Sequence, residues 1–156
     1  GWALEVSGVT RAFEFPKEPD VGFVTVVIMD DNASDLLPAA ATITNTQNNI
    51  DANRPTFMGG VNVIAPTSVA MNLTLENLDP DTAGNRTAVE DAVESFVFTT
   101  TEPEVPIEQE DVENAAQNTT GVNTVSITSP APGPIDPCQY GVFNRVSITW
   151  VPASPP

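Results

Sequence analysis

Residues 23–29 read Phe-Val-Thr-Val-Val-Ile-Met and are followed directly by Asp30 and Asp31. A run this short cannot span a membrane, and its β-branched residues favour a strand. Alternate side chains of a strand point to opposite faces, and apolar residues occupy both faces here. Strands of that kind lie inside a sheet, so we predict a central strand.

The segments on either side of this strand extend the unit. Residues 9–15 form a second predicted strand, joined to the first through the turn formers of 16–22 as a hairpin. Pro38 and three alanines predict a helix with Pro in its first turn, in which Ile43, Gln47 and Ile50 share one face. The helix should end near Asn53, because Pro55 disfavours a helical conformation at the residue before it. Residues 61–65 predict a third strand.

The second half begins with strict alternation over 69–76, which predicts a half-buried strand. Asp79 and Pro80 suggest an N-cap and first helical position. The following apolar residues have helical spacing: Val89, Ala92, Val93, Phe96 and Val97. A shorter helix is expected over about 109–118, with an inner face of Val112, Ala115 and Ala116. Two more strands are predicted around Val125 and Ile127 and around Val146, Ile148 and Trp150, on either side of the proline-rich stretch 130–137.

The predicted fold class is therefore α+β, with two small subdomains that each pack helices on an antiparallel or mixed sheet. Residues 1–65 form a ββαβ subdomain, and residues 66–156 form a βααββ subdomain with a Pro-rich loop and tail. We expect one helix face, Ile43 with Ile50, and another, Val89 with Val93 and Phe96, to be buried against different sheets.

The charge balance restricts the class of partner. Five Lys and Arg residues against 21 Asp and Glu residues give a formal net charge of −16. Such a surface repels phosphate backbones and anionic lipid, so we expect neither nucleic acid nor membrane as a partner. Solubility, a salt-rich environment and docking to a basic neighbour all remain open as reasons for the acidity.

No stretch is long and apolar enough for a membrane span. The first residues lack the basic and apolar regions of a signal peptide. Because the sequence opens on Gly1 and not on Met, we expect either that the natural start lies upstream or that Gly1 is an added residue.

Candidate chemical sites are few, and we assign no catalytic, cofactor-binding or metal-binding residue. The chain has no histidine, so the usual zinc sites are absent and the single Cys138 lacks a histidine base. Asp30, Asn32 and Ser34 have the spacing of the first calcium-loop ligands, but Asp35 and Ala41 stand where that loop needs Gly and Glu. We interpret this segment as a solvated connection.

Two further groups have a structural and a functional interpretation. The carboxylates of residues 102–113 would need an apolar cleft to act as a glycosidase pair, so we interpret them as a solvated face: Glu102, Glu104, Glu108, Glu110, Asp111 and Glu113. Aromatic residues that could stack on sugars fall mostly at strand positions, where core packing is more usual: Trp2, Phe13, Phe15, Tyr140 and Trp150. Asn-x-Ser/Thr patterns occur at Asn32, Asn72, Asn85 and Asn118, and matter only on a glycosylating secretory route.

Several motifs occur together in one order. Residues 2–13 read Trp-Ala-Leu-Glu-Val-Ser-Gly-Val-Thr-Arg-Ala-Phe, residues 50–55 read Ile-Asp-Ala-Asn-Arg-Pro, and residues 61–66 read Val-Asn-Val-Ile-Ala-Pro. Together they resemble the baseplate J-like proteins of Mu-like and P2-like contractile-tailed phages. The resemblance covers about residues 2–128. It departs from the family at Phe13, where Trp is usual, at 104–107, where a Gly-rich turn is usual, and over 130–140.

This resemblance implies a structural role without catalytic residues or cofactors, and places Trp2–Glu5 at the end of a helix. The expected function is a wedge subunit of the tail baseplate that mediates baseplate assembly. Other baseplate subunits and copies of the chain in a ring are the implied partners. The implied location is the virion tail, assembled in the host cytoplasm, and the family's N-terminal region would be missing. An extracellular adhesion or carbohydrate-binding module is the chief alternative, and an unrecognised hydrolase is a further one.

Overall fold

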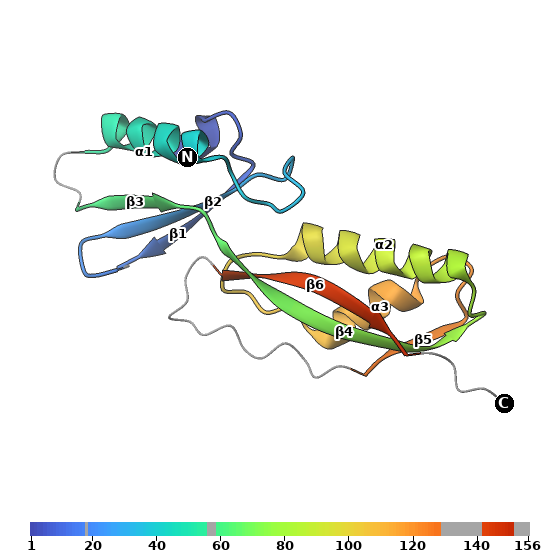
Figure 1. The fold of residues 1–156 in the computed structure, drawn as a ribbon. Coiled ribbons are helices and arrows are strands. Elements are labelled where there is room, and N and C mark those ends of the chain that lie inside the picture. The colour runs from blue at the N-terminus through green and yellow to red at the C-terminus, as the bar shows by residue number, and fades with distance from the viewer. Residues whose placement is uncertain (18, 56–58, 129–141, 152–156) are drawn as a thin grey trace. The chain divides into compact units, whose positions relative to one another are not determined.

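A computed structural model describes residues 1–17, 19–55, 59–128 and 142–151, with backbone only for 142–145. The chain divides into two compact units, Gly1–Thr67 and Ser68–Pro156 (Figure 1). Each unit packs helix against a three-stranded sheet, which confirms the predicted α+β class. No helix in these described ranges has both the length and the apolar character needed to cross a membrane.

The first unit starts with a single 3-10 turn, η1 (Trp2–Glu5), followed by β1 (Arg11–Pro16), β2 (Val24–Met29), α1 (Ala40–Asn53) and β3 (Val61–Ile64). Its strand order is β1-β2-β3, so the central position predicted for β2 is confirmed. β1 pairs antiparallel with β2 as the expected hairpin, and β3 pairs parallel with β2. The sheet is therefore mixed.

The start of α1 differs from the prediction. Ala39, in an extended conformation, is the N-cap and the helix begins at Ala40, so Pro38 precedes the helix and does not occupy its first turn. Leu36 has a φ of 62°, which shows that the chain is still turning two residues before Pro38. The end of the helix is as predicted, because Arg54 is extended before Pro55.

The core of the first unit joins one face of the sheet to α1 and η1. Its buried members are Ala3, Val9, Val26, Ile28, Ile50 and Val63. Of the two isoleucines predicted on the inner face of α1, Ile50 is buried and Ile43 packs against the cluster while partly exposed. Apolar burial between these elements is the main stabilising contribution.

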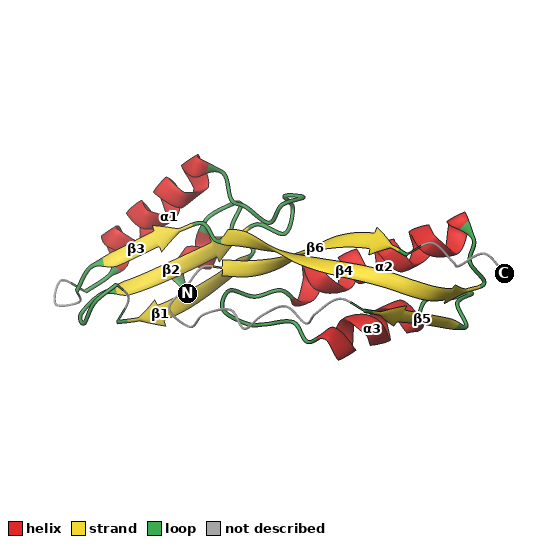
Figure 2. Cartoon of the chain, turned by 60° about the horizontal axis from the view of Figure 1, so that its bottom comes forward, coloured by secondary structure: helices red, strands yellow, loops and turns green. Residues whose placement is uncertain are grey.

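The second unit consists of β4 (Thr67–Asp79), α2 (Ala83–Thr100), α3 (Gln109–Gln117), β5 (Thr124–Ile127) and β6 (Val142–Trp150). Its strand order is β5-β4-β6, with β4 in the centre (Figure 2). The alternation predicted for β4 is confirmed at Met71, Leu73 and Leu75, which are buried, whereas Val69 at the start of the strand is 45% exposed.

The two helices of this unit cover that apolar face of β4. Val89, Val93 and Val97 of α2 are buried, and Phe96 packs against the same cluster while partly exposed. Val112 and Ala116 of α3 complete the cluster. The prediction that the two helices bury apolar faces against different sheets is therefore confirmed for Ile50, Val89 and Val93, whereas Ile43 and Phe96 stay partly exposed.

The N-terminus of α2 also differs from the prediction. Thr82, not Asp79, is the N-cap, and its hydroxyl oxygen accepts a hydrogen bond from the Asn85 amide at 3.1 Å. Asp79 is still part of β4 and pairs with Thr124, so the helix cannot begin there. Pro80 consequently lies in the connection before the helix.

Candidate interaction surface

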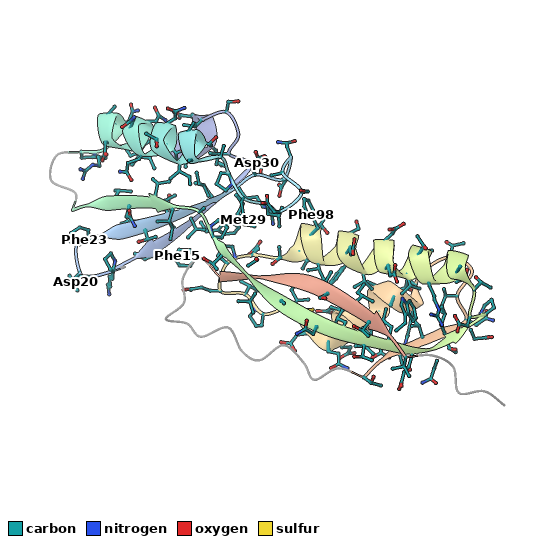
Figure 3. All side chains as sticks on the ribbon, in the orientation of Figure 1. Phe15, Asp20, Phe23, Met29, Asp30 and Phe98 are labelled. Atoms are coloured by element: carbon teal, nitrogen blue, oxygen red, sulfur yellow. The ribbon has the colours of Figure 1, made fainter. Side chains whose placement is uncertain are left out.

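The Asp30 loop is a turn held by its own side chains. Asp30 Oδ1 accepts hydrogen bonds from the Asn32 amide at 3.0 Å and from Asn32 Nδ2 at 2.9 Å. Arg11 pairs with Asp31 at 2.6 Å, which ties the loop to the start of β1. Figure 3 shows Asp30 where the chain leaves β2 beyond Met29. Within the ranges that the structure describes, no group of three His, Cys, Asp or Glu residues is arranged to hold a metal ion.

The carboxylates of 102–113 do not share a desolvated cleft. Four of the six residues are exposed, and Glu104 and Glu113 are half-buried. Glu110 and Asp111 lie in the first turn of α3, where the helix dipole favours negative charge. Glu113 accepts a hydrogen bond from Gln117 one turn later. A general acid would need a dehydrated setting, so this group has the geometry of a charged surface.

The aromatic residues lie in different environments, and Trp150 packs between strand and helix. Trp150 of β6 lies under the Arg86 guanidinium, 5.2 Å from the ring centroid, and its Nε1 donates a hydrogen bond to Glu90. Arg86 also binds both carboxylate oxygens of Asp81 at 2.7 Å. This hydrogen bond lowers the pKa of the Asp81 carboxyl and raises that of Arg86. One face of the Trp150 ring is thus occupied, and the arrangement clamps β6 to α2.

Trp2 and Phe23 are the large aromatic side chains exposed by more than a third in the described part of the chain, at 38% and 45%. Trp2 belongs to η1, whereas Phe23 and Asp20 lie at the hairpin end of the first unit (Figure 3). The Phe23 ring packs on Gly60, where an added Cβ would lie 2.3 Å from a ring carbon. Phe13 and Phe15 are half-buried in β1. Among the residues that the structure describes, the rings therefore form no single stacking platform.

Two of the Asn-x-Ser/Thr asparagines, Asn85 and Asn118, have local structural roles. Asn85 Nδ2 donates hydrogen bonds to the carbonyl oxygens of Pro80 and Gly121, and Asn118 Nδ2 donates one to Asn114. The two Asn85 bonds join the connection before α2 to the connection before β5, whereas the Asn118 bond lies at the end of α3. Cys138, Tyr140 and the proline-rich stretch 130–137 lie outside the described residues.

A pocket of about 180 Å³ opens on the first unit. Ala12, Val24 and Val26 form its floor on the sheet, and Ile50 of α1 and Trp2 and Leu4 of η1 line its sides. The pocket exists because a single long helix covers this face of three strands. Its lining is apolar apart from Glu14, so it offers packing surface and no catalytic pair.

Glutamine side chains cap one edge of each sheet. Gln47 of α1 donates to the carbonyl of Val61 at 3.0 Å and accepts from the amide of Val63 at 2.9 Å, both in the edge strand β3. In the second unit, Gln109 and Gln117 donate to the carbonyls of Ile127 and Val125 in the edge strand β5. Bare edges invite pairing with another chain, and these bonds block β3 and β5.

Charge in the second unit is segregated between its two layers. Residues 83–117, which form the helical layer, contain Arg86 and nine carboxylates: Glu90, Asp91, Glu94, Glu102, Glu104, Glu108, Glu110, Asp111 and Glu113. In the three strands of the sheet, the acidic residues are Glu76 and Asp79 alone. The helical layer is therefore the face that can attract a basic neighbour.

Comparison with known proteins finds a family that matches the first unit. Residues 1–65 match the family model of the baseplate J-like central domain. The resemblance predicted from the motifs is confirmed by this match, which contains all three of the motif segments except Pro66.

The chain is also similar to a longer curated protein. It is 29% identical over 138 residues to baseplate protein gp47 of Escherichia phage Mu. The aligned region covers 83% of this chain, more than the first unit contains, so it includes part of the second unit. The chain spans 38% of the length of that relative.

Proposed function

We propose that the chain is a structural component of a phage tail baseplate, and specifically a wedge subunit that mediates baseplate assembly in a contractile tail. The observation that carries the proposal is the match of residues 1–65 to the baseplate J-like central domain, supported by the similarity to Mu gp47. The role is mechanical and not catalytic. Its partners are other baseplate subunits and copies of itself in a ring, in a virion tail assembled in the host cytoplasm.

The build of the two units supports a load-transmitting role. Each unit has its own buried core, and in the second unit Leu75, Val89, Val93 and Val112 have no exposed surface. Close-packed cores of this kind resist compression and transmit strain. Polar side chains also join the elements to one another, as in the clamp formed by Asp81, Arg86, Trp150 and Glu90.

The acidic helical layer of the second unit supplies a contact surface for a basic neighbour. Complementary charge accelerates encounter and fixes register, and it suppresses wrong pairings. Docking to a basic subunit is therefore the role that we assign to α2, α3 and their connection.

Carbodiimide cross-linking of intact particles tests this proposal, because the reagent joins a carboxyl directly to an amine. The chain has a single lysine, Lys17, so its carboxylates have one internal lysine to react with. We expect Glu110 and Asp111 to be joined to lysines of other baseplate proteins. The matched control is Asp51 of the first unit, which is paired with Arg54 at 2.8 Å and should give fewer links. Links only to Lys17, or links to capsid proteins, would contradict the proposal.

A further inference from the structure

The two edges of the sheet in the second unit differ. The backbone carbonyls on the outer side of β5 are capped by Gln109 and Gln117. β6 forms the opposite edge, and β4 is its one strand neighbour in the part of the chain that the structure describes (Figure 2). With nine residues, β6 presents a row of backbone groups that can pair with a strand of another chain.

The direction of the outer backbone groups of β6 follows from one hydrogen bond. The Val151 amide donates to the carbonyl of Leu75 in β4 at 2.9 Å. Because backbone groups of successive residues alternate in direction, those of Val146, Ile148 and Trp150 face away from β4. An incoming strand would therefore pair with the amides and carbonyls of these three residues.

This edge has an acidic helix beside it. Helix α2 lies along β6 and shares its core (Figure 1). Glu90 of α2 accepts the hydrogen bond from Trp150 Nε1, so Glu90 is on the side of the helix that faces β6. Glu94 follows one turn later on the same side and is exposed. Residues 81–94 contain four carboxylates and one arginine, and β6 adds one arginine, so the net charge here is negative.

We propose that a basic, extended segment of a neighbouring baseplate subunit adds to this sheet as a strand beside β6, with its Lys or Arg side chains bound to Glu90 and Glu94. This rests on the proposed function and specifies how the basic neighbour docks. Every second side chain of a strand points the same way, at intervals of about 6.6–6.8 Å. Glu90 and Glu94 are four helical residues apart, or about 6 Å along the axis, so alternating basic residues match them. Backbone pairing supplies affinity, and the alternate side chains supply specificity.

A second copy of the chain does not fit this role. The two basic residues nearest to each other in its sequence, Arg11 and Lys17, are six positions apart, so no strand of it presents alternating basic residues. Because α2 packs on β6, pairing β6 with β6 would also bring two acidic helices together. The occupant that the charges favour is therefore a different, basic chain.

A synthetic strand tests the backbone pairing. The probe is a capped, fluorescent peptide of sequence Thr-Lys-Val-Lys-Thr-Lys-Val, and the same peptide with Glu in place of Lys is its control. Fluorescence anisotropy should show binding of the Lys peptide and none of the Glu peptide. With the Lys peptide at ten times its Kd, hydrogen exchange of the outward Ile148 amide should slow about tenfold. The Thr149 amide, which faces β4, should change little.

A matched pair of variants tests the place of binding. Glu94→Lys should weaken binding of the Lys peptide about fivefold, because an attraction at the edge becomes a repulsion. Glu110→Lys makes the same change in net charge on α3 and should leave the affinity nearly unchanged. Absence of binding, equal weakening by both variants, equal binding of the Glu peptide, or unchanged exchange at Ile148 would overturn the proposal. Carbodiimide links from Glu110 and Asp111 to other baseplate proteins would survive that result, so the failures of the two proposals are distinguishable.

Discussion

The two units solve the same packing problem with different numbers of helices. In the first unit α1 alone covers three strands with help from one turn of η1, and a pocket lined by Trp2, Leu4 and Val24 stays open. In the second unit α2 and α3 together cover β4, and Leu75 at the centre has no exposed surface. In this chain, therefore, two helices close the core over a three-stranded sheet and one helix does not. Both units cap one sheet edge with glutamine.

The largest expected effect contrasts the closed core with the open pocket. Leu75→Ala should lower the free energy of unfolding by about 2–5 kcal/mol, because it leaves a cavity in a close-packed interior. Leu4→Ala is the matched change at a side chain that is 51% exposed beside the pocket, and it should cost less than about 1 kcal/mol. Urea denaturation of each variant measures both. Equal losses would show that the pocket is as closed as the core.

The glutamine caps should have an intermediate effect. Gln47→Ala removes two hydrogen bonds to β3 and uncovers the amide of the buried Val63, so we expect a loss of about 1–2 kcal/mol. Gln109→Ala and Gln117→Ala each remove one bond to β5 and should cost about half as much. Thermal unfolding checks this order, with the exposed Asn48→Ala of α1 as a control that should change little. An unchanged unfolding temperature of Gln47→Ala would show that the β3 edge does not need its cap.

The clamp on β6 is a smaller contribution of the second unit. Trp150→Phe keeps a ring beneath Arg86 and loses the hydrogen bond from Nε1 to Glu90, at a cost of about 1 kcal/mol. Trp2→Phe makes the same change at an exposed ring of the first unit and should be nearly neutral. Chemical denaturation followed by far-UV circular dichroism compares the two. A larger loss at Trp2 would mean that the clamp is not stabilising.

The smallest expected effect is a pH dependence from Asp81. Its pKa is lowered in the folded chain by the hydrogen bond from Arg86, so the pair stabilises the fold above the ordinary pKa of an aspartate. That contribution is lost as the pH falls through the lowered pKa of the folded state. Asp81→Asn should therefore lower stability at pH 7 and flatten its decline on acidification. Parallel unfolding curves of the two proteins at every pH would contradict this.

Periodicity in the sequence predicted most of the elements, because burial alternates with the period of each one. The alternation from Val69 to Glu76 and the helical spacing from Val89 to Val97 correspond to β4 and α2. The starts of both long helices were predicted wrongly. Local residue preferences placed the helix starts at Pro38 and at Asp79. The chain is still turning just before Pro38, and Asp79 is still paired in β4.

Contacts between distant residues could not be read from the sequence. Gln47 was predicted on the inner face of its helix, yet its role as a cap depends on where β3 lies. The stacking of Arg86 on Trp150 likewise depends on β6 reaching α2. Charge segregation, by contrast, is visible in the sequence, because the carboxylates cluster over residues 90–113 while the strands of the second unit are nearly free of them.

A map of the intact tail tests the central claim most directly, since it locates the chain in the particle. Electron cryomicroscopy of assembled particles should show both units in the baseplate, with the acidic layer of α2 and α3 against a basic neighbour. Density for the two units in the capsid, or at a fibre tip in contact with host sugar, would contradict the account.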